Sequence, residues 1–173
     1  MTPPPHILLR LARPEDVDTI VSFSAAMALE TEGRHLDLER LRQGTLSLLN
    51  ASAYGFFQLA EVHDGQPSGI VAQLMVTYEW SDWRNGIFWW IQSVYVAPAW
   101  RRQGVFRRMH DAVLTDAMRR PDVCGVRLYV EEANQAARSA YRRVGLSHSS
   151  YAVYEKDFVL AKSQCLEDRP HEA

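Results

Sequence analysis

The chain has 173 residues, of which 47% are hydrophobic, and its formal net charge at pH 7 is −2. This length and composition suit one globular domain, and the near-neutral charge argues against a nucleic-acid-binding protein. No apolar run reaches the roughly 20 residues of a membrane span, and the chain does not begin with a basic leader, so we expect no membrane contact and a cytoplasmic location. Cys124 and Cys165 are too few for a disulfide framework or a zinc site, and no histidine pair has metal-ligand spacing, so no metal is expected.

The first third of the chain predicts one strand and two helices. Residues 6–11 have the pattern of a strand, and the segment Arg13-Pro14-Glu15-Asp16 suits a first helical turn. That helix should end near Gly33, and Asp37 suits the N-cap of a second helix. The positions expected to face the core are Val17, Ile20, Val21 and Met27 in the first helix, and Leu38, Leu41, Leu48 and Leu49 in the second.

Three strands are predicted next, at residues 54–62, 70–78 and 87–96. The dipeptides Asp64-Gly65 and Asn85-Gly86 separate them, and both are hairpin signals, so these strands should pair antiparallel. The third strand is almost continuously apolar, which is typical of a strand covered on both faces. Pro98 ends it, because proline has no N–H to donate to a neighbouring strand.

A short basic turn, Arg101-Arg102-Gln103-Gly104, joins this strand to a helix. The first turn of a helix leaves four backbone N–H groups unpaired, and Gly104 has no Cβ to keep a ligand from the backbone. A phosphate or pyrophosphate is the natural occupant of such a turn; the alternative is an ordinary turn with a solvated basic face. The apolar stripe of the helix is expected at Val105, Met109, Ala112, Val113 and Ala117.

The remaining elements complete an α/β (α+β) domain. A fifth strand is predicted at residues 125–130, a helix from Asn134 to Gly145, and a last strand at residues 150–158. The elements follow one another along the chain in the order β-α-α-β-β-β-α-β-α-β. Because the two strands of a strand–helix–strand crossover run parallel, with a right-handed connection, the central sheet should be mixed. We expect one domain over residues 6–158, followed by a polar tail at residues 159–173.

Two segments resemble motifs of the GCN5-related N-acetyltransferase (GNAT) superfamily, whose members transfer an acetyl group from acetyl-CoA to an amine. Residues 94–105 resemble its acetyl-CoA signature, Gln/Arg-x-x-Gly-x-Gly/Ala. Asn134, Ala137, Tyr141 and Gly145 resemble its second motif, and residues 13–16 resemble the opening of its first helix. The resemblance implies a GNAT-like fold over residues 6–158 with acetyl-CoA as acyl donor.

The resemblance also implies how the cofactor would be held. Backbone groups of Val94 and Val96 would bind the pantetheine arm, backbone amides of residues 103–107 would bind the pyrophosphate, and arginines would pair with phosphates. Asn134 would face the pantetheine end, or serve only as a helix N-cap. Phe106 stands where the family has glycine or alanine, which would give the pyrophosphate a bulkier wall. The implied cofactor-binding residues are Val94, Val96, Arg101, Arg102, Gln103, Gly104, Val105, Phe106, Arg107, Asn134 and Tyr141.

Tyr141 is the implied general acid, because a thiolate leaves faster when a proton is supplied; the alternative is a core tyrosine. Some family members carry a glutamate base on the central strand, but here Trp89, Trp90 and Gln92 occupy the comparable positions, and none accepts a proton at neutral pH. Glu79 is therefore the first candidate for the general base. Like the other candidate acids, it could instead be a solvated surface residue. The other candidates are Asp82, Glu30 and Glu32.

We therefore expect an N-acetyltransferase that acts by direct attack of a primary amine in a ternary complex. The alternative is a non-catalytic, acyl-CoA-binding regulatory domain, which would not need the missing carboxylate. The amine acceptor, either a small molecule or a peptide, stays open. An aromatic group around one hairpin suits an acceptor pocket, a cation site, or a core or homodimer contact; its members are Trp80, Trp83, Trp89 and Trp90.

Overall fold

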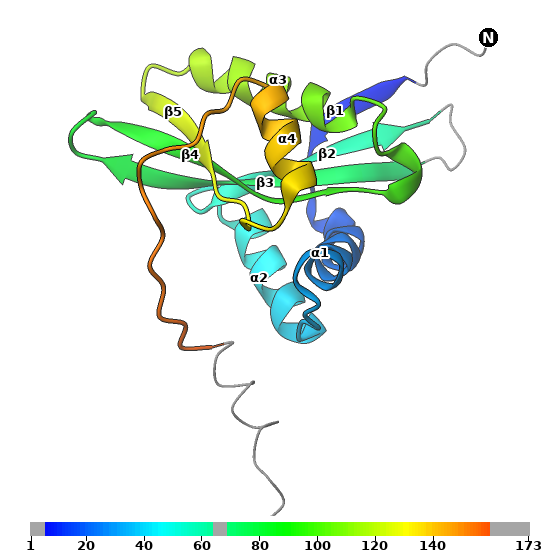
Figure 1. The fold of residues 1–173 in the computed structure, drawn as a ribbon. Helices are drawn as coiled ribbons and strands as arrows, with labels where there is room; N and C mark the ends of the chain where they lie inside the picture. Colours follow the sequence, from blue (N-terminus) through cyan, green and yellow to red (C-terminus); the bar gives the residue numbers. More distant parts are fainter. Residues whose placement is uncertain (1–5, 64–68, 160–173) are drawn as a thin grey trace, which may run out of the picture.

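The computed structural model describes residues 6–63 and 69–159, so the Asp64-Gly65 turn and most of the predicted tail lie outside the described residues. One sheet has the order β1-β2-β3-β4-β5, formed by β1 (Ile7–Leu11), β2 (Gly55–Val62), β3 (Gly69–Ser81), β4 (Gly86–Val96) and β5 (Val123–Leu128). The α-helices are α1 (Val17–Glu32), α2 (Leu38–Asn50), α3 (Val105–Met118) and α4 (Gln135–Arg143). Figure 1 shows α1 and α2 on one face of the sheet and α3 and α4 on the other. None of the helices described is long and apolar enough to cross a bilayer.

The sheet is mixed, as the order of elements predicted. The first four strands pair antiparallel with their neighbours, and β4 and β5 pair parallel. The predicted hairpin at Asn85-Gly86 is present, with Asn85 at a φ of +46°. β5 begins at Val123, two residues before the prediction, because Val123 pairs with Ile87, whose N–H also donates to the Asp122 carbonyl at 2.8 Å.

The core lies on both faces of the sheet, and helical periodicity located most of the residues that the α-helices contribute to it. The α3 stripe is confirmed: its buried members are Val105, Met109, Val113 and Ala117. On the other face, Ile20 of α1 and Leu48 of α2 pack with Phe57 and Leu59 of β2. The prediction for Leu38 is wrong. It is 57% exposed, because it is the first residue of α2 and the apolar stripe becomes covered only from Leu41 onward.

The predicted last strand is absent. Residues 150–158 form no strand, and Tyr151, Val153 and Tyr154 are all at least two-thirds exposed. Figure 1 shows this segment running away from the sheet, whose last strand is β5. An alternating pattern produces a strand only where a neighbour pairs with its backbone and one of its faces is buried, and neither condition is met here.

The four tryptophans around the β3–β4 hairpin do not form one cluster. Trp89 is buried in the core, whereas Trp80 and Trp83 are exposed and Trp90 lies 5.4 Å from the ring of Tyr129. Successive residues of a strand point to opposite faces, so neighbours in sequence are separated by the sheet.

An ion-pair group fixes the entry into α1. The Arg10 guanidinium donates to both carboxylate oxygens of Asp16, at 2.7 and 2.9 Å, and its Nε donates to Glu61 at 2.6 Å. Asp16 also accepts from the Arg13 backbone N–H at 2.8 Å, which closes the first turn. The hydrogen bond from Arg10 holds the pKa of Asp16 below its usual value, against the opposing effect of burial.

We expect Asp16→Asn to lower the free energy of unfolding by about 1–3 kcal/mol at pH 7, because the side chain keeps its shape but loses the charge that Arg10 binds. A carboxyl group with a lowered pKa stabilises the fold above its unfolded pKa, and this contribution is lost as pH falls through the folded pKa. Denaturant unfolding at pH 7 and pH 3 measures this: the difference in the free energy of unfolding between wild type and Asp16→Asn should be smaller at pH 3 than at pH 7. Glu15→Gln is the control, because Glu15 is an exposed acid in the same turn. An equal decrease in the free energy of unfolding for this variant would show that the ion pair with Arg10 is not the cause.

Candidate active site

A gap opens between β4 and β5 beyond the middle of β4. Their pairing ends at Ile91 opposite Leu128, but β4 continues to Val96. The Ala97 N–H donates to Val71 of β3, and backbone groups of successive strand residues point to opposite edges. The N–H and C=O groups of Val94 and Val96 therefore point to the side that β5 has left.

A bulge lies at the point where the gap begins. The β3–β4 register shifts between Gln73 and Met75, and Ser93 has a φ of +48°, which is uncommon for a residue other than glycine. The bulge redirects the strand just before Val94. It therefore also sets which way the backbone groups in the gap are aimed.

The basic turn opens α3 without a side-chain cap. Gly104 is the N-cap, with a φ of +79°, and a Cβ added to it would meet no atom within 4 Å. The turn itself is held by Gln103, whose side-chain amide donates to the Ala99 carbonyl at 2.7 Å. The first-turn N–H groups of α3 thus face open space next to exposed arginines, an arrangement that fits an anionic group.

Arg101 links this turn to the end of α1. Its guanidinium donates to the Glu30 carboxylate at 2.6 Å, and its Nε donates to the Val96 carbonyl at 2.8 Å. The Tyr95 hydroxyl donates to the other Glu30 oxygen at 3.3 Å, and burial, followed by the Glu30 charge, raises the pKa of Tyr95. Glu30 therefore lies beside the gap, although it is 71 residues from Arg101 in sequence.

Tyr141 lies beside the first turn of α3. Its ring meets the edge of the Phe106 ring at a centroid distance of 5.5 Å, so the bulky residue in the signature packs toward α4. Burial raises the pKa of Tyr141 above the usual value of a tyrosine. Asn134 caps α4, accepting from the Ala137 N–H at 3.0 Å.

Glu79 is not brought to this group of residues. It lies opposite Phe88, three residues before the end of the β4–β5 pairing, and its carboxylate pairs with Arg127 at 2.9 Å and accepts from the Trp90 indole N–H. The Gln92 side chain is also engaged: it donates to Thr77 and accepts from the Tyr129 hydroxyl. No group of three or more metal-binding side chains occurs within residues 6–63 and 69–159.

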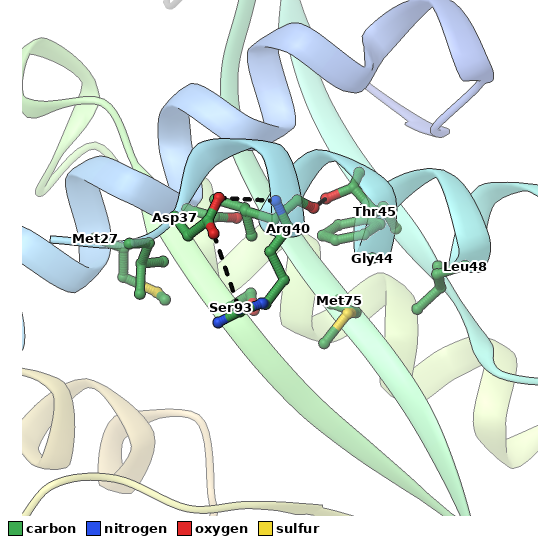
Figure 2. A pocket seen from close by; sticks show the side chains of 12 residues that line it. Met27, Asp37, Arg40, Gly44, Thr45, Leu48, Met75 and Ser93 are labelled. Carbon is green, nitrogen blue, oxygen red and sulfur yellow. Dashed lines mark hydrogen bonds and ion pairs between the residues drawn. The ribbon is translucent and has the colours of Figure 1, made fainter. Parts of the chain in front are cut away.

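A cavity of about 390 Å³ lies between α1, α2 and the sheet (Figure 2). Its lining residues come from both helices, from the loop between them and from β2, β3 and β4: Ser24, Met27, Leu36, Asp37, Arg40, Leu41, Gly44, Thr45, Leu48, Phe57, Met75 and Ser93. Ser93, at the bulge of β4, joins the cavity to the gap. Sequence patterns marked several of these residues only as core positions, because the cavity depends on contacts between distant elements.

Comparisons with known proteins identify the family. The family model described as Acetyltransferase (GNAT) family matches residues 25–146. A solved structure of "a possible acetyltransferase" from Clostridium difficile 630 is 40% identical, with a TM-score of 0.81, over 88% of this chain and 98% of that one. No curated protein sequence matches the chain significantly.

Two more distant structures share the fold. A predicted acetyltransferase from Clostridium acetobutylicum, solved with acetyl-CoA, is 17% identical with a TM-score of 0.71, over 87% of this chain and 96% of that one. An aminoglycoside acetyltransferase from an uncultured soil metagenomic sample, solved with sisomicin, is 15% identical with a TM-score of 0.68, over 88% of this chain and 96% of that one. On the family match and the 40% identity, the chain belongs to the acetyltransferase (GNAT) family and is an acetyl-CoA-dependent N-acetyltransferase.

Proposed function

We propose that the protein transfers the acetyl group of acetyl-CoA to a primary amine by direct attack in a ternary complex. The observation that carries this proposal is the gap in the sheet: the backbone groups of Val94 and Val96 face it, and it lies beside the uncapped first turn of α3. The gap suits an extended amide-bearing arm, and the turn suits the pyrophosphate at its end. Thiol release from acetyl-CoA, measured across a panel of amines, tests it directly.

In this proposal the donor lies along the gap with its phosphates at α3. Amides of residues 103–107 hold the pyrophosphate, as helix N-termini commonly do. Arg102 and Arg107 are exposed beside them, and Arg101 reaches the phosphates once it leaves Glu30. Asn134 keeps α4 in register, which supports the position of Tyr141.

Tyr141 serves as general acid in this proposal. Attack by the amine breaks the C–S bond, and the departing thiolate takes a proton from the phenol. The phenol carries its proton at neutral pH, as a general acid must, and burial raises its pKa further. Its ring packs against Phe106 of α3, and its helix, α4, follows β5, the strand that borders the gap.

For the base we propose Glu30 in place of Glu79. Glu30 contacts Tyr95 and Arg101, which flank the gap, and it follows the cavity residue Met27 by one helical turn. Both acids pair with an arginine, but Glu79 lies opposite Phe88 toward the hairpin end of the sheet, where β4 is still paired with β5. A carboxylate beside both the cavity and the gap can take the ammonium proton directly or through one water.

A non-catalytic acyl-CoA-binding regulatory domain would share the fold and the cofactor contacts. It would bind acetyl-CoA without releasing thiol in the presence of any amine. The family match and the 40% identity to a possible acetyltransferase favour the enzyme.

Replacing Gly104 should weaken donor binding. We expect Gly104→Ala to lower acetyl-CoA affinity by at least about tenfold, or 1.4 kcal/mol, because the new Cβ enters the space facing the amides and the left-handed φ becomes strained. Calorimetry on the folded variant measures this. Gly33→Ala controls for strain, because Gly33 has a similar positive φ and equally open surroundings. Equal acetyl-CoA affinities of the two variants would mean that the pyrophosphate does not bind at Gly104.

Tyr141→Phe should lower kcat by roughly 10²-fold while acetyl-CoA affinity stays nearly constant, because the lost proton matters mainly in the transition state. The high-pH limb of the rate profile should also disappear, since the rate of wild type falls as pH rises through the raised pKa of the phenol. A variant with full kcat and a lower melting temperature would instead identify Tyr141 as a core residue.

Glu30→Gln should lower kcat by roughly 10²-fold with a cationic amine, because no carboxylate then takes the ammonium proton. Glu79→Gln is the matched variant, and we expect its kcat to stay within about threefold of wild type. Steady-state rates at saturating acetyl-CoA measure both. If only Glu79→Gln loses activity, the base is Glu79 and the present assignment is wrong.

A further inference from the structure

The cavity and the gap meet at one residue. Ser93 lines the cavity and immediately precedes Val94, whose backbone groups face the gap. Figure 2 shows the cavity residues of α1 and α2 lying over the strands, with Ser93 at the β4 side. A molecule in the cavity would therefore present one end at the bulge, next to the acetyl end of a donor lying along β4.

The cavity walls are mainly apolar. Six of the twelve lining residues are Met27, Leu36, Leu41, Leu48, Phe57 and Met75. Two of them are methionines, whose flexible, polarizable side chains adapt to varied apolar shapes. The volume of about 390 Å³ is within the range that holds a small molecule.

The polar groups in the walls are bonded to the protein itself. The Asp37 carboxylate caps α2, accepting from the N–H groups of Glu39 and Arg40 at 3.0 and 3.1 Å, and it lies 3.9 Å from the Arg40 guanidinium. The Thr45 hydroxyl donates to the Leu41 carbonyl, and the Ser24 hydroxyl accepts from Gln73. One carboxylate and one guanidinium cancel in charge, so nothing in the lining attracts several positive charges at once.

From this lining we propose that the acceptor is a small primary monoamine with an aliphatic or aromatic body, which fills the cavity while its nitrogen lies at Ser93. The inference rests on the proposed function and names its substrate class. A polyamine or an aminoglycoside would bring additional ammonium groups against apolar walls without partners, which is unfavourable because a charge removed from water needs a partner. A monoamine brings a single charge, which lies at the bulge and leaves only its apolar body against the walls.

The transfer is balanced as follows. The ammonium group gives one proton to Glu30, the free amine forms the C–N bond to the acetyl carbonyl carbon, and the C–S bond breaks. The thiolate takes a proton from Tyr141, the second proton of the nitrogen passes through solvent to restore the Tyr141 phenol, and Glu30 releases its proton to solvent. The products are the N-acetylated amine, free CoA thiol and one released proton.

The test compares two classes of amine by thiol release from acetyl-CoA. We expect kcat/KM for 2-phenylethylamine and hexylamine to exceed that for spermidine and sisomicin by at least about tenfold. Equal or higher values for the polycations would overturn the inference and leave acetyl transfer to amines intact. If no amine of either class releases thiol although acetyl-CoA binds by calorimetry, the proposed function fails and the inference fails with it.

A pair of variants on α2 ties the preference to the cavity. Leu41→Glu places a carboxylate in the apolar wall, whereas Leu38→Glu places the same group on the exposed side of the same helix, outside the lining. We expect Leu41→Glu to lower kcat/KM for 2-phenylethylamine by at least tenfold and to leave acetyl-CoA affinity unchanged. The ratio of kcat/KM for 2-phenylethylamine to kcat/KM for spermidine should therefore fall. Leu38→Glu should match wild type. Identical behaviour of the two variants would overturn the inference.

Met75→Ala keeps the test decisive if Leu41→Glu does not fold. Truncating Met75 enlarges the cavity from the β3 side, so KM for hexylamine should rise and KM for a bulkier amine, 2-(1-naphthyl)ethylamine, should fall. Acetyl-CoA affinity should not change, because β3 does not border the gap. A uniform change in KM for both amines would mean that the amine body lies outside the cavity.

Discussion

The loss of a pairing partner by β4 is the constraint on which the site depends. β5 accompanies β4 only as far as Ile91, so the last part of β4 has one edge without a neighbouring strand. Backbone groups left without a partner inside a fold must bond to water or to a ligand. The gap therefore presents a ready row of donors and acceptors, and the bulge at Ser93 fixes its direction. The basic turn extends the same line into the first turn of α3.

The gap also makes one region of β4 accessible to side chains from both faces of the sheet. Tyr141 belongs to the layer of α3 and α4, whereas Glu30 and the cavity belong to the layer of α1 and α2. A continuous sheet would keep these layers apart by its full thickness. In the proposed mechanism, the acid from one layer and the base from the other both approach a thioester that lies along β4 where β5 no longer pairs with it. Acyl donor and amine can then enter from opposite sides without competing for space.

Sequence patterns predicted the structural features that depend on residues close together in the chain. The α3 stripe, the Asp37 cap and the turn ending at Gly104 follow from helical periodicity and capping, and all three are present. Contacts between distant elements were not predictable. Nothing in the sequence pairs Glu30 with Arg101, or indicates that Arg127 and Trp90 occupy Glu79. The strand expected at residues 150–158 is absent for a related reason, since alternation does not specify whether a neighbouring strand is available.

The contacts of Arg101 have a consequence for the order in which the substrates can bind productively. Arg101 covers the Val96 carbonyl and neutralises Glu30 at the same time. A donor that bonds to Val96 must displace the guanidinium, and phosphates at the adjacent turn offer it a new partner. An amine that arrives first meets a carboxylate still occupied by its arginine. Under the proposed roles, productive binding is sequential with the donor leading, and departure of CoA last returns Arg101 to Glu30, which resets the enzyme for the next cycle.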